Sequence, residues 1–254
     1  MKKAVPIIAG ALVIVAASAA IGGYQLYLKE AQEQALREEE EKYAYERQNP
    51  EEIIPGEIPV KFEILQEENP DIYAWITIPG TLIDEPLLQR EDDNGYYASH
   101  DRYGKESSSG ALYTENYNGR DFTDPLTVVY GPNCEDETLF GSLYHYSDNL
   151  FMEEHPNIYI YTPEKIQKYR IFAAYRGDNR HLMHRYKMGE KESSRRALLN
   201  DIFDSRDMGS RIDRSAPVDE TDQILTLSTH VSTHDSSGEE YRYLVQAYLE
   251  EVTE

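Results

Sequence analysis

The stretch Ile224-Leu-Thr-Leu-Ser-Thr-His230 decides how this chain folds, in partnership with Tyr241-Arg-Tyr-Leu-Val-Gln-Ala-Tyr-Leu249 farther along. Apolar residues are interleaved with threonines in the first stretch, and aromatic and β-branched residues fill the second. Both compositions suit a pleated, half-buried surface, so we predict a strand in each. The residues between them, 232–240, are polar and include a glycine, which predicts a connecting loop.

Another strand-like segment, Val128-Val-Tyr130, is followed by Gly131-Pro-Asn-Cys134 and then by Thr138-Leu-Phe-Gly141. Together with the first stretch, these residues resemble the signature of the sortases, the cysteine transpeptidases of Gram-positive cell surfaces. In that family a Thr-Leu-x-Thr-Cys strand end carries the nucleophile, and the next strand carries an arginine. A Tyr-Gly-His-Asn strand end carries the catalytic histidine.

Two of the three catalytic positions are changed in this chain. Thr226-Leu-Ser-Thr229 fits the family pattern, and Arg242 fits the arginine that holds the oxyanion. His230 stands at the cysteine position, and Pro132 stands at the histidine position. Judged without the resemblance, Arg242 would be a solvated ion-pair residue of small energetic consequence.

The segment Asn69-Pro-Asp-Ile-Tyr-Ala-Trp-Ile-Thr-Ile-Pro-Gly-Thr81 resembles the opening of class B sortases in particular, as does Asn94-Gly-Tyr-Tyr97. Leu198, Leu199, Ile202 and Phe203 line one face of a predicted helix that precedes the first stretch. Class B sortases carry a helix there. The resemblance therefore implies a mainly β fold over residues 60–254, a closed eight-stranded barrel with peripheral helices.

The N-terminus predicts a membrane anchor over residues 1–28. Ala4 to Leu28 contains no charged residue, and about 20 apolar residues suffice to span a bilayer. Lys2 and Lys3 precede this run and an acidic segment follows it, which favours a cytoplasmic N-terminus and an extracellular remainder. A cleaved signal peptide is the alternative, because Ala17-Ser18-Ala19 has the small-residue form that a signal peptidase accepts. Residues 29–59 are predicted to form an acidic helical stalk and a proline-rich linker.

Composition narrows the class of partner. The 254 residues carry a formal net charge of −22, which argues against nucleic acid and anionic lipid as partners of the folded part. The single cysteine excludes an intramolecular disulfide. His181 and His184 are three residues apart, and His230 and His234 four, but no thiolate or carboxylate has matching spacing, so we interpret them as scattered surface histidines. We expect a monomer without metal or cofactor.

The altered positions bear directly on catalysis. Family chemistry needs a thiolate that forms a thioester, a histidine that protonates the leaving amine and an arginine that stabilises the oxyanion. Pro132 has no titratable group, so it cannot act as acid or base. We therefore expect negligible transpeptidation and a chain that binds a sorting-signal peptide, a surface protein or an assembly partner. The alternative is an active cysteine transpeptidase in which Cys134 is the nucleophile and His230 the base.

The resemblance also implies a peptide groove. Its lining positions, which would accept an Asn-Pro-Gln-Thr-Asn-like sorting signal, are Asn94, Ala98, Tyr130, Ser228 and Thr229. Judged from the residues alone, Tyr130 and Ser228 would be ordinary strand packing.

Overall fold

The computed structural model describes residues 24–31, 34–35, 37–38, 40–44, 46–50, 57–186, 192–207, 209–231 and 240–254. The chain forms two compact units, Met1–Tyr45 and Glu46–Glu254. In the first unit the described residues from 24 to 44 have helical backbone. Among all described residues, no helix has both the length and the apolar character needed to cross a membrane. Residues 1–23 of the predicted anchor lie outside the described part, and the predicted domain boundaries stay a prediction.

The second unit contains all the strands that the structure describes. In chain order these strands are β1 (Ile72–Thr77), β2 (Asp84–Leu88), β3 (Tyr113–Thr114), β4 (Leu126–Tyr130), β5 (Asn157–Tyr161), β6 (Ile166–Asp178), β7 (Arg211–Ile212), β8 (Ile224–His230) and β9 (Tyr241–Thr253). The helices between them are α2 (Phe62–Glu68), α3 (Asn149–Glu154), α4 (Leu182–Tyr186) and α5 (Glu192–Asp204), with 3-10 turns η2 (Tyr96–Ala98) and η3 (Gly141–Ser147).

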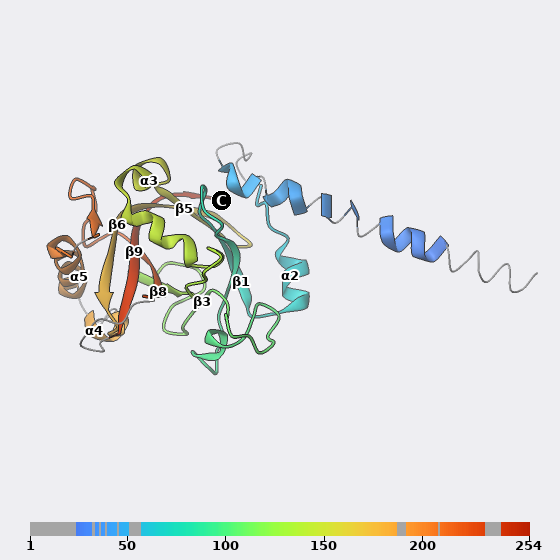
Figure 1. Ribbon diagram of the computed structural model, residues 1–254, viewed down its shortest axis with the longest axis horizontal. Coiled ribbons are helices and arrows are strands. Elements are labelled where there is room, and N and C mark those ends of the chain that lie inside the picture. Colours follow the sequence, from blue (N-terminus) through green and yellow to red (C-terminus); the bar gives the residue numbers. More distant parts are fainter. Residues whose placement is uncertain are drawn as a thin grey trace, which may run out of the picture. The chain divides into compact units, whose positions relative to one another are not determined.

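Eight of these strands close into a barrel (Figure 1). Their order is β5-β1-β2-β3-β4-β8-β9-β6, and a further pairing of β6 with β5 joins the two ends of the sheet. The short β7 pairs with β6 outside this ring. Closure leaves no open edge among the eight strands, which removes the template for pairing with another chain. The predicted closed eight-stranded barrel with peripheral helices is confirmed.

Strand β8 lies between a parallel neighbour and an antiparallel one. In the parallel pair Tyr130 on β4 is opposite Ser228. In the antiparallel pair Ser228 is opposite Leu244, and His230 is opposite Arg242. The strands predicted over 224–230 and 241–249 are therefore both found, side by side.

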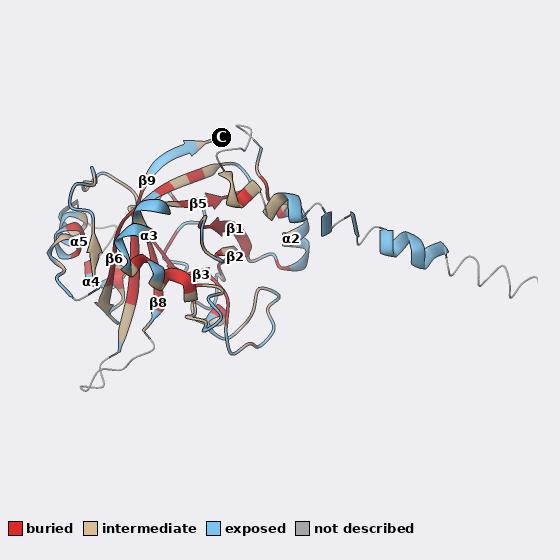
Figure 2. Ribbon diagram, turned by 45° about the horizontal axis from the view of Figure 1, so that its top comes forward, coloured by how far each residue is buried: buried red, intermediate tan, exposed pale blue. Residues whose placement is uncertain are grey.

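Alternation along β8 divides its side chains between two cores. Leu225 and Leu227 belong to the cluster that includes Val129 and Val245, which fills the barrel interior. Ile224 belongs to a second cluster in which Leu198 and Ile202 of α5 pack against the outer face of the barrel. Both faces of the strand are therefore buried, and Figure 2 shows the barrel strands largely red. A side chain at an even position of β8 consequently lies on the face that α4 and α5 partly cover.

The Pro79-Gly80 turn after β1 yields the first testable prediction. Thr81 N–H donates to the Ile78 carbonyl at 3.1 Å, and Gly80 has a φ of 85°, as a type II turn requires. A Cβ on Gly80 would also run into the ring of His155. We expect Gly80→Ala to lower the free energy of unfolding by about 1–2 kcal/mol through backbone strain alone, with a further loss from the collision. Urea denaturation of residues 46–254 measures it.

Gly95→Ala is the matched control for the turn. Gly95 has a φ of −96°, and a Cβ there would meet the Asp93 carboxylate at an ordinary 3.6 Å. This variant should stay within about 0.5 kcal/mol of the wild type. Equal losses from the two variants would mean that the turn conformation does not matter for stability.

Candidate functional site

The strongest local feature is the cross-strand pair of His230 and Arg242. Opposite residues on antiparallel strands have Cβ atoms about 4.5–5.5 Å apart and project from the same face. His230 is exposed at the end of β8. Partial burial lowers the pKa of His230 and the Arg242 charge lowers it further, while Glu240 acts in the opposite direction. The imidazole is therefore mainly neutral at pH 7.

Arg242 is held in place by hydrogen bonds from the segment after β6. Its Nε donates to Asn179 Oδ1 at 2.8 Å, and Asn179 Nδ2 donates to Glu240 Oε2 at 2.7 Å. The guanidinium carbon lies 5.8 Å from the ring centre of Tyr130. Because only Nε is engaged by Asn179, the two terminal nitrogens can point donors at a ligand carbonyl.

Pro132 is brought to the same end of the barrel by the ladder between β4 and β8. Gly131 N–H donates to the Ser228 carbonyl at 3.1 Å, and Thr229 Oγ1 donates to the Gly131 carbonyl at 2.8 Å. A Cβ on Gly131 would collide with Leu112 and Phe140, so only glycine fits at position 131 without a shift of these side chains. The loop that carries Pro132 therefore leaves β4 directly beside the end of β8.

A cleft of about 140 Å³ opens next to Arg242. Its lining residues are Tyr113, Glu115, Val128, Tyr130, Asp178, Asn179, Arg180, His181, Leu182, Ser228, Arg242 and Leu244. Tyr130 and Ser228 share its floor, as adjacent positions on β4 and β8. Burial raises the pKa of Tyr130, and the nearby Glu115 carboxylate adds to the increase. The Tyr130 phenol therefore stays protonated near neutral pH.

Sequence reasoning missed the polar pair of this cleft. His181 Nε2 and Glu115 Oε2 lie 2.5 Å apart, although the two residues are 66 positions apart in the chain. The rings of His184 and Tyr117 pack against His181 at 4.4 and 5.6 Å. His181 is therefore part of the cleft and not a scattered surface histidine. The sequence offers no periodicity or motif that links positions 115 and 181.

Three of the expected groove residues lie apart from the cleft lining. Asn94 Oδ1 accepts a hydrogen bond from Asn116 N–H at 2.8 Å and so braces the loop after β3. Ala98 is exposed on η2. Thr229 is fully buried, with its hydroxyl bound to the Gly131 carbonyl. Their predicted roles in substrate binding stay predictions.

Cys134 lies in the loop between β4 and η3 and is half-buried. Its carbonyl accepts from Glu137 N–H at 3.2 Å, in a tight turn. No hydrogen bond joins Cys134 to His230 in the part of the chain that the structure describes. The exchange of roles between these two residues stays a prediction.

His234 lies outside the described residues. Within them, no group of three or more histidine, cysteine, aspartate or glutamate side chains is arranged to hold a metal ion.

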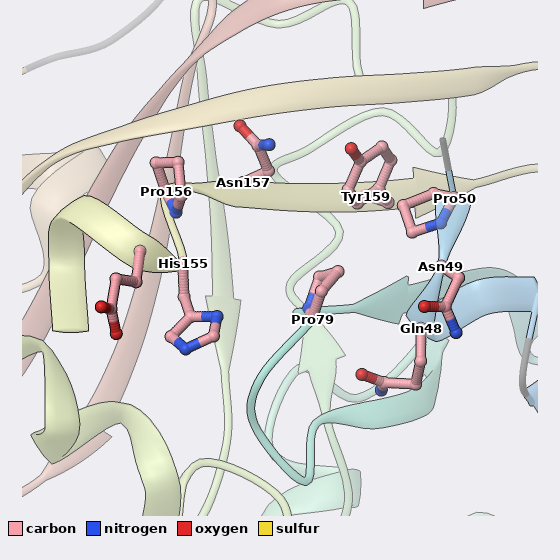
Figure 3. A pocket seen from close by; sticks show the side chains of 9 residues that line it. Gln48, Asn49, Pro50, Pro79, His155, Pro156, Asn157 and Tyr159 are labelled. Carbon is pink, nitrogen blue, oxygen red and sulfur yellow. The ribbon is translucent and has the colours of Figure 1, made fainter. Parts of the chain in front are cut away.

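A larger cavity of about 310 Å³ lies elsewhere on the second unit (Figure 3). Residues 48–50 line it together with Pro79, His155 and Tyr159. None of the predicted site residues lines it. The smaller cleft is the better candidate site, because it combines Arg242, a histidine–carboxylate pair and the strand ends that carry the sequence motifs.

Comparison with known proteins agrees with this fold. No family model matches the chain. Sortase B of Listeria monocytogenes is 29% identical over 196 residues, covering 77% of this chain and 76% of that protein. Sortase B of Staphylococcus aureus is 27% identical over 235 residues, covering 90% of each.

The barrel itself is also similar to solved structures. A Staphylococcus aureus sortase B–substrate complex matches with a TM-score of 0.66 at 23% identity, over 88% of this chain and 99% of that one. At this identity the match is a likeness of fold. Bacillus anthracis sortase B in complex with AAEK1 matches with a TM-score of 0.65 at 26% identity, over 81% of this chain and 93% of that one. Sequence relatives and barrel together support the assignment of this chain to the class B sortase family.

Proposed function

We propose that this chain is a membrane-anchored, cell-surface member of its family that binds a sorting-signal peptide or an assembly partner without efficient transpeptidation. In this proposal residues 1–28 anchor the chain and the barrel faces the outside of a Gram-positive cell. The observation that carries it is the pairing of His230, in place of a cysteine, with Arg242 beside a loop that has Pro132 in place of a histidine.

The chemistry of these side chains supports the loss of transfer activity. A thioester is stable enough to wait for an amine acceptor, whereas an acyl-imidazole on His230 would hydrolyse readily. Pro132 has no proton to give to a leaving amine. Losing one member of a catalytic unit typically costs about 10⁴–10⁶ in rate, and further losses add little.

The surviving features support binding. Arg242 retains donors beside a cleft whose floor contains Tyr130 and Ser228. A guanidinium next to an aromatic floor suits the carbonyl groups and side chains of an extended peptide. The related Staphylococcus aureus protein has been solved as a substrate complex, which makes a peptide the first ligand to test on this chain.

A direct binding measurement tests the proposal. A fluorescently labelled Asn-Pro-Gln-Thr-Asn peptide should bind the wild type in an anisotropy titration and emerge uncleaved. Arg242→Ala should weaken this binding at least about tenfold, because a hydrogen bond from a charged donor contributes about 1.5–3 kcal/mol.

Arg206→Ala serves as the control, since the Arg206 side chain is 64% exposed and pairs with Asp204 away from the cleft. If the wild type does not bind the peptide, or if the two variants bind it equally well, the proposal that this site binds the peptide is wrong. Cleavage by the wild type that Cys134→Ala stops would instead establish the alternative nucleophile.

A further inference from the structure

The cleft is too small in this conformation for the ligand proposed above. Its volume is about 140 Å³. Sites for drug-sized ligands typically measure roughly 300–1,000 Å³. An extended peptide of several residues needs at least as much room as such a ligand. A peptide that enters this cleft as far as Ser228 and Arg242 therefore needs it wider than it is in this structure.

Two walls define the cleft, and they come from distant parts of the chain. Tyr113 and Glu115, on β3 and just after it, form one wall. Residues 178–182, between the end of β6 and the start of α4, form the other. Asn179 ties the second wall to Arg242 and Glu240 at β9. The cleft therefore widens when Tyr113 and Glu115 move away from residues 178–182.

The hydrogen bond between Glu115 and His181 crosses from one wall to the other. The carboxylate can only accept, so His181 donates through Nε2. The Glu115 and His181 side chains are 19% and 30% exposed, so solvent reaches the contact. His181 Nδ1 is buried and has no hydrogen-bond partner among the described residues, so Glu115 is the polar anchor that the structure shows for this ring.

We propose that the Glu115–His181 hydrogen bond is a strap that holds the cleft contracted and has to open before a ligand enters. The identity of the ligand as a peptide rests on the proposed function, whereas the strap does not. When the strap opens, Glu115 loses the His181 donor and keeps the Tyr130 hydroxyl, so one of its hydrogen-bonding positions is free for a ligand. A peptide that offers an amide or hydroxyl donor to Glu115 replaces the lost bond, so ligands with such a donor at this point are selected.

Opening can be measured without any peptide. Ser228→Cys in a Cys134→Ala background gives the full chain one thiol, on the floor of the cleft. The rate of its alkylation by iodoacetamide, followed by intact-mass spectrometry, reports how often the cleft is open. His181→Phe keeps a ring against Tyr117 and His184 but removes the donor. We expect about tenfold faster alkylation, the effect of one charge-assisted hydrogen bond discounted for partial exposure.

Matched variants separate the strap from general loosening. His184→Phe makes the same exchange on the neighbouring ring and should leave the rate unchanged. Glu115→Leu should accelerate alkylation at least as much as His181→Phe does, and the double variant should be no faster than Glu115→Leu alone, because both changes remove the Glu115–His181 hydrogen bond. If His181→Phe does not fold, the alkylation rate of Glu115→Leu tests the strap in its place.

Each alkylation rate is read beside the thermal midpoint of the same variant, so that unfolding is not mistaken for opening. An unchanged rate in His181→Phe, or an equal increase in His184→Phe, overturns the strap. Failure of every variant to bind the labelled peptide, with the alkylation pattern intact, would overturn the proposed function alone.

Discussion

Pro132→His together with His230→Cys is expected to create cleavage of an Asn-Pro-Gln-Thr-Asn peptide at a rate at least about 100-fold above that of the wild type. The double change supplies a thiolate beside Arg242 and an acid beside the end of β4, the two functions that the chain lacks. Recovery should be partial, because a displacement of about 1 Å of the new thiol or imidazole can cost roughly 100-fold. Separation of the cleaved peptide by chromatography measures the rate.

The single variants discriminate between explanations of a gain. Each should do far less than the pair, because nucleophile and general acid act as a unit. Adding Arg242→Ala to the double variant should abolish the gain if this arginine stabilises the oxyanion. A double variant that binds the peptide but never cleaves it would show that the cleft has diverged beyond positions 132 and 230.

Arg47→Ala is expected to lower the free energy of unfolding of residues 46–254 by about 3–5 kcal/mol, because it leaves the largely buried Asp84 carboxylate without its charged partner. Arg47 donates to both carboxylate oxygens of Asp84, at 2.8 and 2.9 Å, and to the Pro59 carbonyl at 3.0 Å. Its side chain is 3% exposed, and its guanidinium carbon lies 4.6 Å from the Trp75 ring. Urea unfolding followed by Trp75 fluorescence measures the change.

Asp84 explains why this loss should be large. Its Oδ1 also accepts from Trp75 Nε1 and Thr77 Oγ1, both at 2.7 Å, so the alanine variant leaves a charge with neutral donors alone. The control is Arg206→Ala, which removes an exposed ion pair with Asp204 and exposed hydrogen bonds to the Phe203 and Ser205 carbonyls and should cost no more than about 1 kcal/mol. A loss from Arg47→Ala as small as that of the control would mean that Arg47 does not brace the barrel.

Several elements were predictable because their signals are local. The apolar, aromatic and β-branched residues over 224–230 and 241–249 identified β8 and β9, because such side chains pack well on a pleated surface. Pro79-Gly80 identified its turn, because proline presets one backbone angle and glycine accepts the positive φ. The family motifs led to the pairing of His230 with Arg242, which needs only two neighbouring strands in register.

The sequence by itself thus determined the strands, the turn and the barrel family, because residue type and spacing act on the backbone within a few positions. Tertiary structure alone decided which side chains meet. Glu115 and His181 are 66 residues apart and Arg47 and Asp84 are 37, and their contacts exist because barrel closure brings separate loops together. Thr229 was expected in the groove but is buried, because one step along a strand turns a side chain to the opposite face. Such choices depend on register and loop path, which no short stretch of residues encodes.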